Sequence, residues 1–511
     1  MDNIGRVDSV RNEICFVTAL EGVGLGNVVS FSSGARGLVL GFEGTRAEVI
    51  MLHGFAQVKK GDLVRVSAPL MTTKVSNALL GRVIDPLGTP LDGLGEVETY
   101  EGVDLPIESP ARPIYQRAII NRPLVTGYMV IDSQIPIGLG QRELLLGEKK
   151  SGQTDTAIDI LCNQAKLDTG LIPIYVAIDA ETAGTKRRIE RLEKSGALKN
   201  GLVIVGRTAQ AAALNYIAPM VGVTIAEWFA SKGKNVLIVF DDLTRHAKVY
   251  RQIALLLGRP ASREAYPGDI FYLHSRLLER CGSFNAMAGS GTITGLPIVE
   301  SQSEEATDYV TTNLMSITDG HVLFRQTLAN RGNRPPIDSG FSVSRIGGRA
   351  QMPLIRTLSE KLKEIIIRYE EVIRFMAFGS DLSESARPAY EIGIRASNIF
   401  QQDHNDGYSN VQQAVLMYFI ISRTANSWSE DQMPALCKYI ADMVTNKPYS
   451  DVLNQSMLAM PFDHAEILLK EFMVDLAKAP GVPVRAERKE RLVAETETLE
   501  GVLRNDEEIL K

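Results

Sequence analysis

The stretch RELLLGEKKSGQTDTAIDIL, residues 142–161, decides the fold. It begins with an apolar run typical of a buried strand, passes through a loop framed by two glycines and ends in a helical pattern. In a Walker A loop this order lets backbone N–H groups wrap phosphates while the N-terminus of the helix adds a favourable dipole. The stretch therefore predicts a P-loop inside a central α/β domain.

Eight consecutive residues are candidate nucleotide contacts: Gly147, Glu148, Lys149, Lys150, Ser151, Gly152, Gln153 and Thr154. They match G-x-x-x-x-G-K-[ST] at every fixed position except the lysine, which is Gln153 here. That lysine is normally the point charge against the β- and γ-phosphates, and an amide cannot neutralise charge. Lys149 and Lys150 either turn inward to supply the charge or are solvated surface lysines. A glycine turn that binds no nucleotide is a third interpretation.

A second feature of a nucleotide site follows the apolar run NVLIVF at 235–240, which ends in Asp241-Asp242. In Walker B sites an acid at the carboxyl end of a strand holds Mg²⁺ or its water, and the P-loop hydroxyl reaches the same ion. We therefore predict Thr154 and Asp241 as metal-binding residues and Mg-ATP or Mg-ADP as the cofactor. Acids also end strands for other reasons, so the pair favours the fold more strongly than a bound metal.

Two further domains flank this centre. Six short β-branched runs bounded by Gly or Asp fill residues 1–70 and predict a small N-terminal β-barrel. Residues 71–350 are assigned to the central domain, with a Pro- and Gly-rich ordered connector at 80–140. Residues 351–511 carry apolar residues at three- and four-residue spacing and predict a C-terminal helical bundle. In the central domain, strands alternate with helices and are expected at 142–147, 172–178, 201–206 and 235–240.

Composition and charge argue against several classes of protein. The chain has 511 residues, and its 55 Lys and Arg against 61 Asp and Glu give a net charge of -6, which disfavours a general nucleic-acid surface. No stretch reaches about 18 consecutive apolar residues, so no membrane span is expected. The 4 cysteines form no CxxC pair and are expected to be small buried hydrophobic residues. No secretory signal or transit segment is visible.

Several longer strings resemble one family, the alpha subunit of the F-type rotary ATP synthase. The resemblance runs from the barrel to about residue 420, and more loosely to the end. Within that family, SVSR separates alpha from the catalytic beta subunit. The matching strings are TGYMVIDSQIPIGLGQRELLLG at 126–147, FDDLTRHAKVYRQIALLLGRPASREAYPGDIFYLHSRLLER at 240–280, SITDG at 316–320, SGFSVSRIGGRAQ at 339–351 and FGSDL at 378–382.

The resemblance implies a RecA-like central domain and an alternating alpha–beta hexamer in which beta is catalytic. It implies that Arg345 is an arginine finger extended into the catalytic site of a neighbouring beta subunit, and that Ser342 is linked to activity. Stabilising the charge of a transferring phosphoryl group is the chemistry that such an arginine performs. Without the family, Arg345 reads as a surface ion pair and the Ser342 hydroxyl as part of a turn.

The resemblance also implies the surroundings of the chain. The expected partners are the beta subunit, a gamma-like central stalk and a peripheral stalk or delta subunit, with membrane contact only through other subunits and no nucleic acid. The expected function is ATP synthesis or hydrolysis on beta, coupled to proton transport. The expected location is the cytoplasmic face of the bacterial plasma membrane, or alternatively the mitochondrial matrix face or the thylakoid stromal face. Family members usually carry an amphipathic arm before the barrel, whereas this sequence enters barrel-like strands almost at Met1, so stator attachment is left open.

The sequence departs from the family around the chain's own nucleotide pocket. Gln153 replaces the P-loop lysine, Leu139 replaces an arginine before GQRE, and Ala180 stands where beta carries a water-orienting glutamate and alpha a glutamine. An alanine can neither act as a base nor position water, so hydrolysis by this chain alone is not expected. The pocket is expected to be impaired. Gln402 falls near an adenine-contacting glutamine of the family, but its divergent flank QQDHNDGYS does not support that role.

Two other interpretations compete with this one. The degenerate pocket also suits a structural alpha-like paralogue in an F1-like ATPase motor that is not coupled to proton translocation. The non-catalytic subunit of a vacuolar- or archaeal-type ATPase also lacks a P-loop, but SVSR, EAYPGD and the surviving GxxxxG-x-T frame argue against it. The 6 histidines include no HExxH motif or close pair, and His274 is expected to be structural.

Overall fold

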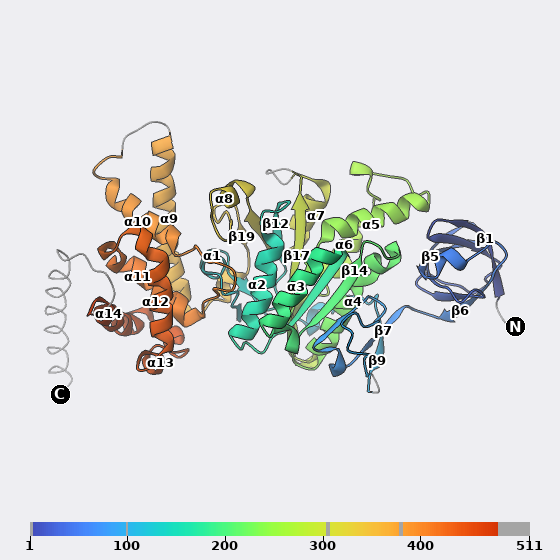
Figure 1. Ribbon diagram of the computed structural model, residues 1–511, viewed down its shortest axis with the longest axis horizontal. Helices are drawn as coiled ribbons and strands as arrows, with labels where there is room; N and C mark the ends of the chain where they lie inside the picture. Colours follow the sequence, from blue (N-terminus) through green and yellow to red (C-terminus); the bar gives the residue numbers. More distant parts are fainter. Residues whose placement is uncertain (1–3, 99–100, 303–306, 378–381, 479–511) are drawn as a thin grey trace.

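A computed structural model of the chain describes residues 4–98, 101–302, 307–377 and 382–478. Three units follow one another along the long axis, with a β-barrel at one end, an α/β unit in the middle and a helical unit at the other end (Figure 1). The predicted fold class is therefore confirmed. Most of the FGSDL string and the final part of the predicted helical bundle lie outside the described residues.

The N-terminal unit is a closed barrel with the strand order β1-β2-β5-β4-β3-β6. Closure leaves no unpaired strand edge, and alternate side chains such as Val17, Val49 and Met51 fill the interior. All six strands predicted from the β-branched runs are present: β1 Ile4–Arg11, β2 Ile14–Thr18, β3 Val28–Phe31, β4 Arg36–Glu43, β5 Arg46–His53 and β6 Leu63–Ala68.

The central unit is built on a sheet with the order β19-β18-β12-β17-β15-β13-β14-β8, with β16 paired to β17. Every pairing along that order is parallel except the one between β18 and β19. The four strands predicted from apolar runs are confirmed as β12 Glu143–Glu148, β13 Ile172–Ala180, β14 Leu202–Arg207 and β15 Asn235–Asp241. The other strands are β8 Arg82–Ile84, β16 Gly282–Ser283, β17 Thr292–Ser301, β18 Gly320–Phe324 and β19 Val343–Ser344.

Strand β17 lies between β12 and β15 and yet was not predicted. Its sequence, TITGLPIVES, contains Gly295 and Pro297, which weaken a strand signal read from sequence alone. The strand is almost entirely buried, so its position between two neighbours determines its conformation. Short strand β8 comes from the predicted connector and extends the sheet beyond β14.

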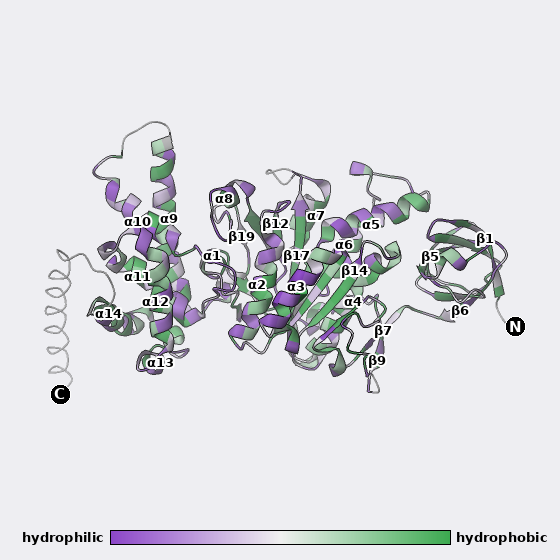
Figure 2. Cartoon of the chain, in the orientation of Figure 1, coloured by the Kyte–Doolittle hydropathy of each residue, from purple (hydrophilic) through white to green (hydrophobic). Residues whose placement is uncertain are grey.

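Helices cover both faces of this sheet. Residues alternating along β13 enter two separate cores, since Ile174 and Val176 pack with α4 to α7 while Tyr175 and Ala177 pack with α2 and α3. Figure 2 shows the central strands as hydrophobic and the outer surface of α3 as hydrophilic. The helices are α1 Met129–Gln134, α2 Gln153–Lys166, α3 Thr182–Lys194, α4 Ala212–Ser231, α5 Leu243–Leu256, α6 Ile270–Leu278, α7 Tyr309–Ile317 and α8 Gln326–Asn330.

The described part of the connector takes part in two small antiparallel pairs. Strand β7 (Thr72–Val75) pairs with β9 (Val103–Pro106), and β10 (Pro123–Leu124) pairs with β11 (Ile137–Gly138).

The C-terminal unit is helical, and in its described part no strand occurs. Its apolar faces meet around α11, which is buried along most of its length. The helices are α9 Pro353–Ala377, α10 Arg387–Asn398, α11 Asn410–Ile421, α12 Met433–Thr445, α13 Tyr449–Val452 and α14 Phe462–Lys478.

Candidate functional site

The predicted P-loop connects β12 to α2, as a Walker A loop does. Gly147 is required there, because a Cβ on it would lie 2.5 Å from the Ser151 hydroxyl oxygen and 2.6 Å from the carbonyl oxygen of Phe324. Gly152 has a φ of 101° and immediately precedes the helix, a conformation that glycine adopts without strain. The frame of a phosphate loop is therefore intact.

The side chain of Gln153 folds back into this loop. Its amide nitrogen donates to the carbonyl oxygen of Glu148 at 3.1 Å, and its amide oxygen lies 3.0 Å from the Ser151 hydroxyl oxygen. Gln153 is only 4% exposed and Ser151 is fully buried, whereas Lys149 and Lys150 are exposed. The amide therefore braces the loop from within, and no cation of the loop occupies the position of the missing lysine.

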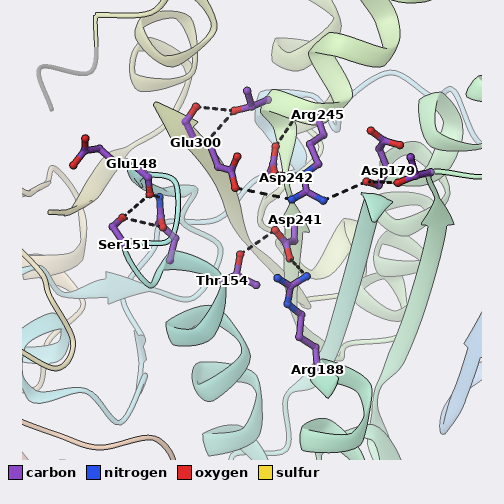
Figure 3. A network of polar contacts seen from close by, with 12 residues as sticks. Glu148, Ser151, Thr154, Asp179, Arg188, Asp241, Asp242, Arg245 and Glu300 are labelled. Atoms are coloured by element: carbon purple, nitrogen blue, oxygen red, sulfur yellow. Dashed lines mark hydrogen bonds and ion pairs between the residues drawn. The ribbon is translucent and has the colours of Figure 1, made fainter. Parts of the chain in front are cut away.

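The predicted metal-binding pair is in contact. The Thr154 hydroxyl donates to one oxygen of the Asp241 carboxylate at 3.1 Å, across the gap between α2 and the end of β15. The other oxygen accepts a hydrogen bond from the Tyr175 hydroxyl at 2.5 Å and lies 3.3 Å from a guanidinium nitrogen of Arg188. Figure 3 shows Thr154 and Arg188 converging on Asp241 from two helices. The sequence had indicated neither Arg188 nor Tyr175.

The second acid of the pair also meets an arginine. Asp242 accepts the backbone N–H of Arg245 at 2.7 Å, which caps α5, and its carboxylate lies 3.0 Å from the Arg245 guanidinium. Arg245 also donates to the carbonyl oxygen of Asp179 at 3.2 Å and lies 4.0 Å from the Glu300 carboxylate (Figure 3). Burial, with the neighbouring charge of Asp241 adding to it, raises the pKa of Asp242 to about 7.

The other residues that the sequence analysis names near the nucleotide pocket are buried. They are Leu139, Ala180 and Gln402. Leu139 and Ala180 belong to the buried core on the α2–α3 side of the sheet. Gln402 is 3% exposed, and its amide is used entirely by backbone groups of Met129, Gly127 and Asp406 at 2.6, 2.8 and 2.8 Å. In this structure Gln402 therefore fastens the segment before α11 to the segment before α1.

A separate loop carries Ser342 and Arg345. The Ser342 hydroxyl donates to the carbonyl oxygen of Asp338 at 2.6 Å and accepts the Leu323 N–H at 2.9 Å, so it anchors the loop. The Ser344 hydroxyl donates to the carbonyl oxygen of Pro136 at 2.6 Å. At Gly347 a Cβ would lie 1.6 Å from that same oxygen, so only glycine fits. The backbone of the loop is held at several points.

Arg345 projects from this anchored loop. Its backbone N–H donates to the carbonyl oxygen of Asp319 at 3.1 Å, while its side chain is exposed. Within the described part of the chain its guanidinium makes no hydrogen bond and no ion pair. The surface ion pair considered from the sequence is therefore absent there, and the charge is available to another molecule.

Arg345 and the P-loop lie at opposite ends of β12. Asp319, which holds the backbone of Arg345, also pairs with Arg142 just before the strand begins, whereas the P-loop follows the strand's last residue, Glu148. Six residues of parallel strand span roughly 20 Å. An arginine side chain cannot bridge that distance, so Arg345 does not reach the P-loop of its own chain.

A glycine-framed loop between a buried strand and a helix, beside a strand that ends in paired acids, defines the fold of a P-loop protein. Residues 127–344 match the ATP synthase alpha/beta family, nucleotide-binding domain, and residues 351–464 match the ATP synthase alpha/beta chain, C terminal domain. The chain belongs to the ATP synthase alpha/beta family.

Relatives of similar length carry the name ATP synthase subunit alpha. The one from Mycoplasmoides gallisepticum is 40% identical over 443 residues, which cover 87% of this chain and 85% of the relative. Those from Macrococcus caseolyticus and Caldanaerobacter subterraneus are each 42% identical, over 81% and 82% of this chain and 82% of each relative. The resemblance to alpha subunits inferred from the sequence strings is confirmed.

Two features are absent from the residues that the structure describes. None of their helices combines the length and apolar character that a bilayer crossing requires. They also hold no group of three or more His, Cys, Asp or Glu side chains placed to bind a metal ion.

A pair of histidines far apart in sequence meets in the core. His246 of α5 and His274 of α6 have ring nitrogens 3.1 Å apart, and the other ring nitrogen of His246 lies 2.9 Å from the carbonyl oxygen of Tyr216. Both rings are buried, which supports a structural role for His274. Burial lowers the pKa of His246 to about 4 and that of His274 well below its usual value.

We expect this pair to make the chain sensitive to mild acid. Folded-state pKa values below the unfolded value of about 6.5 mean that the unfolded chain binds protons that the folded chain does not. The contribution of the pair is fully present above pH 6.5 and is lost as the pH falls from 6.5 towards 4. Melting temperatures at pH 7.5 and pH 5 should show a smaller difference in His274→Phe than in the wild type. The exposed-site control His53→Gln should keep the full difference, and a wild-type difference no larger than that of His274→Phe would contradict the prediction.

Proposed function

We propose that this chain is a non-catalytic alpha subunit of a rotary F-type ATP synthase. In an alternating hexamer with beta subunits, Arg345 enters the catalytic site on beta and stabilises the charge of the transferring phosphoryl group. One observation carries the proposal: an exposed guanidinium without a partner in the described chain stands on an anchored loop, a full strand away from the chain's own P-loop. A positive charge held in this way suits a site completed by two subunits.

The remaining parts of the proposal follow from the family. The partners are beta and a gamma-like central stalk, with the peripheral stalk or delta subunit reached through contacts that the described residues do not identify. ATP synthesis or hydrolysis on beta is coupled to proton transport, and the chain is held at the membrane surface by other subunits. Ser342 contributes by anchoring the loop that carries Arg345, through its hydrogen bonds to Asp338 and Leu323.

The chain's own nucleotide site is impaired under this proposal. Gln153 supplies no positive charge to a phosphate, Ala180 supplies no group to position water, and Lys149 and Lys150 are exposed. Turnover therefore depends on beta sites alone. The chain expressed without beta should show no ATP hydrolysis above background, and co-expression with its beta subunit should yield a complex that hydrolyses ATP. Hydrolysis by the isolated chain, or failure to form any complex with beta, would contradict the proposal.

Nucleotide content gives a further prediction. The purified alpha–beta complex, loaded with Mg-ATP and passed through a desalting column, should retain about one nucleotide for each alpha–beta pair rather than about two, since the alpha site lacks its phosphate-binding cation. The measurement is acid extraction followed by chromatographic quantification of ADP and ATP. A complex of beta with an alpha subunit that keeps the P-loop lysine is the control and should retain more. Equal retention in both complexes would contradict the prediction.

A further inference from the structure

The acid pair at the end of β15 is already neutralised by the protein itself. A Walker-type metal site uses the P-loop hydroxyl and an acid oxygen as ligands, directly or through water. Here the Thr154 hydroxyl gives its proton to Asp241 at 3.1 Å, and the other carboxylate oxygen is shared by Tyr175 and Arg188. Both oxygens of Asp241 are therefore engaged before any ligand arrives.

Arg188 also places a full positive charge beside the Asp241 carboxylate, where a divalent cation would bind. Its guanidinium lies 3.3 Å from the Asp241 carboxylate, whose side chain is only 6% exposed, and 3.4 Å from the Tyr175 hydroxyl oxygen. A divalent cation on Asp241 would stand a few ångströms from that guanidinium, where like charges repel strongly because burial weakens screening. The residues present do not fit a Mg-nucleotide.

Each acid of the Asp241-Asp242 pair has an arginine of this chain beside it. Asp241 pairs with Arg188, and Asp242 pairs with Arg245 at 3.0 Å. The P-loop beside them is braced by the amide of Gln153. Side chains of this chain therefore make the contacts that a bound Mg-nucleotide makes in other P-loop proteins.

We propose that Arg188 replaces the divalent cation as the permanent counter-ion of Asp241, so that this site is a structural element that binds neither metal nor nucleotide. The inference deepens the proposed function at the chain's own impaired site, and it does not depend on the role of Arg345. The alpha subunit then keeps its folded nucleotide domain whatever the concentrations of Mg²⁺ and ATP.

The first test uses the unmodified full-length chain and Mn²⁺ as the metal probe. Electron paramagnetic resonance of free Mn²⁺, with and without ADP, should give the same binding for the wild type and for Asp241→Asn, and EDTA should not change the melting temperature. A wild-type Mn²⁺ site that Asp241→Asn removes would overturn the proposal. This arm needs no change to Arg188, so a misfolded variant cannot obscure it.

The second test measures whether Arg188 and Asp241 act as a pair. Arg188→Leu leaves a buried carboxylate without its counter-ion and should lower the melting temperature by on the order of 5 °C. The matched control is Arg187→Leu on the exposed side of α3, which should change it little. Combining Arg188→Leu with Asp241→Asn should restore part of the loss, since neither charge is then left alone.

Additive losses in the double variant, or an Arg188→Leu melting temperature equal to that of Arg187→Leu, would overturn the proposal. All of these readouts are made on the chain without beta and without turnover. A failure here therefore leaves the proposed role of Arg345 standing, and a failure of the Arg345 assay leaves this inference standing.

Discussion

Replacing Arg345 with alanine in the alpha–beta complex is expected to lower ATP turnover by about 10³-fold or more, the range in which arginine fingers operate. The guanidinium makes no ion pair or hydrogen bond within the described residues, so its removal breaks no such contact and only withdraws a charge that lowers the pKa of the buried Glu143. The loop stays anchored through Ser342, Ser344 and Gly347. We therefore expect assembly and the melting temperature to be unchanged while the maximal rate of ATP hydrolysis falls.

Three variants separate this role from a general effect of charge. Arg349→Ala removes an exposed arginine four residues further on and should keep most of the turnover. Arg345→Lys keeps the charge but loses the planar two-pronged donor, so partial activity is expected. Ser342→Ala should act through the loop, lowering turnover and the melting temperature together, because the Leu323 N–H and the Asp338 carbonyl lose their shared partner. Full turnover in a well-assembled Arg345→Ala complex would rule out the finger.

Much of the fold could be predicted because its signals are local. The six barrel strands and four of the central strands are short apolar or β-branched runs with Gly or Asp at their ends, which punctuate the chain strongly. Strand β17 was not predicted because Gly295 and Pro297 interrupt its apolar run. The two strands that flank it in the sheet determine its conformation instead. The helical unit was recognisable from its spacing, since a helix such as α9 buries one stripe, although α11 is buried along most of its length.

The candidate site was predictable only in part. The Walker A and Walker B patterns predict that Thr154 and Asp241 lie close together, and the Thr154 hydroxyl lies 3.1 Å from the Asp241 carboxylate in the structure. Arg188 was missed because it lies in TKRRIERLEK, where a run of charges on an amphipathic helix reads as a solvated face. Which of those basic side chains turns towards Asp241 depends on how α3 leaves β13 and packs against α2. The contact of His246 with His274 depends in the same way on the packing of α5 and α6.

Replacing Asp132 with alanine is expected to lower the free energy of unfolding by about 4 kcal/mol, because it leaves several buried hydrogen-bond donors without an acceptor. One carboxylate oxygen accepts the backbone N–H and hydroxyl of Thr126 at 3.0 and 2.7 Å. The other accepts the Gly127 N–H at 3.0 Å and the Gln413 amide at 2.7 Å. Burial raises the pKa of Asp132 to about 6 although these hydrogen bonds oppose the rise, so the group is ionised at pH 7.5.

Because Gln413 belongs to α11 and Thr126 precedes α1, this carboxylate joins the helical unit to the nucleotide unit. Asp132→Ala should therefore increase hydrogen exchange in both segments, not only around the substitution. Asp132→Asn should fall between wild type and alanine, since its amide nitrogen would face donors from Gly127 and Gln413. Asp442→Ala, an exposed position on α12, is the matched control and should change little. If exchange rose only near residue 132 and α11 stayed protected, Asp132 would be a local cap of α1, and the link between the two units would rest on other contacts, such as the hydrogen bonds of Gln402 and the contact of His404 with Asp159.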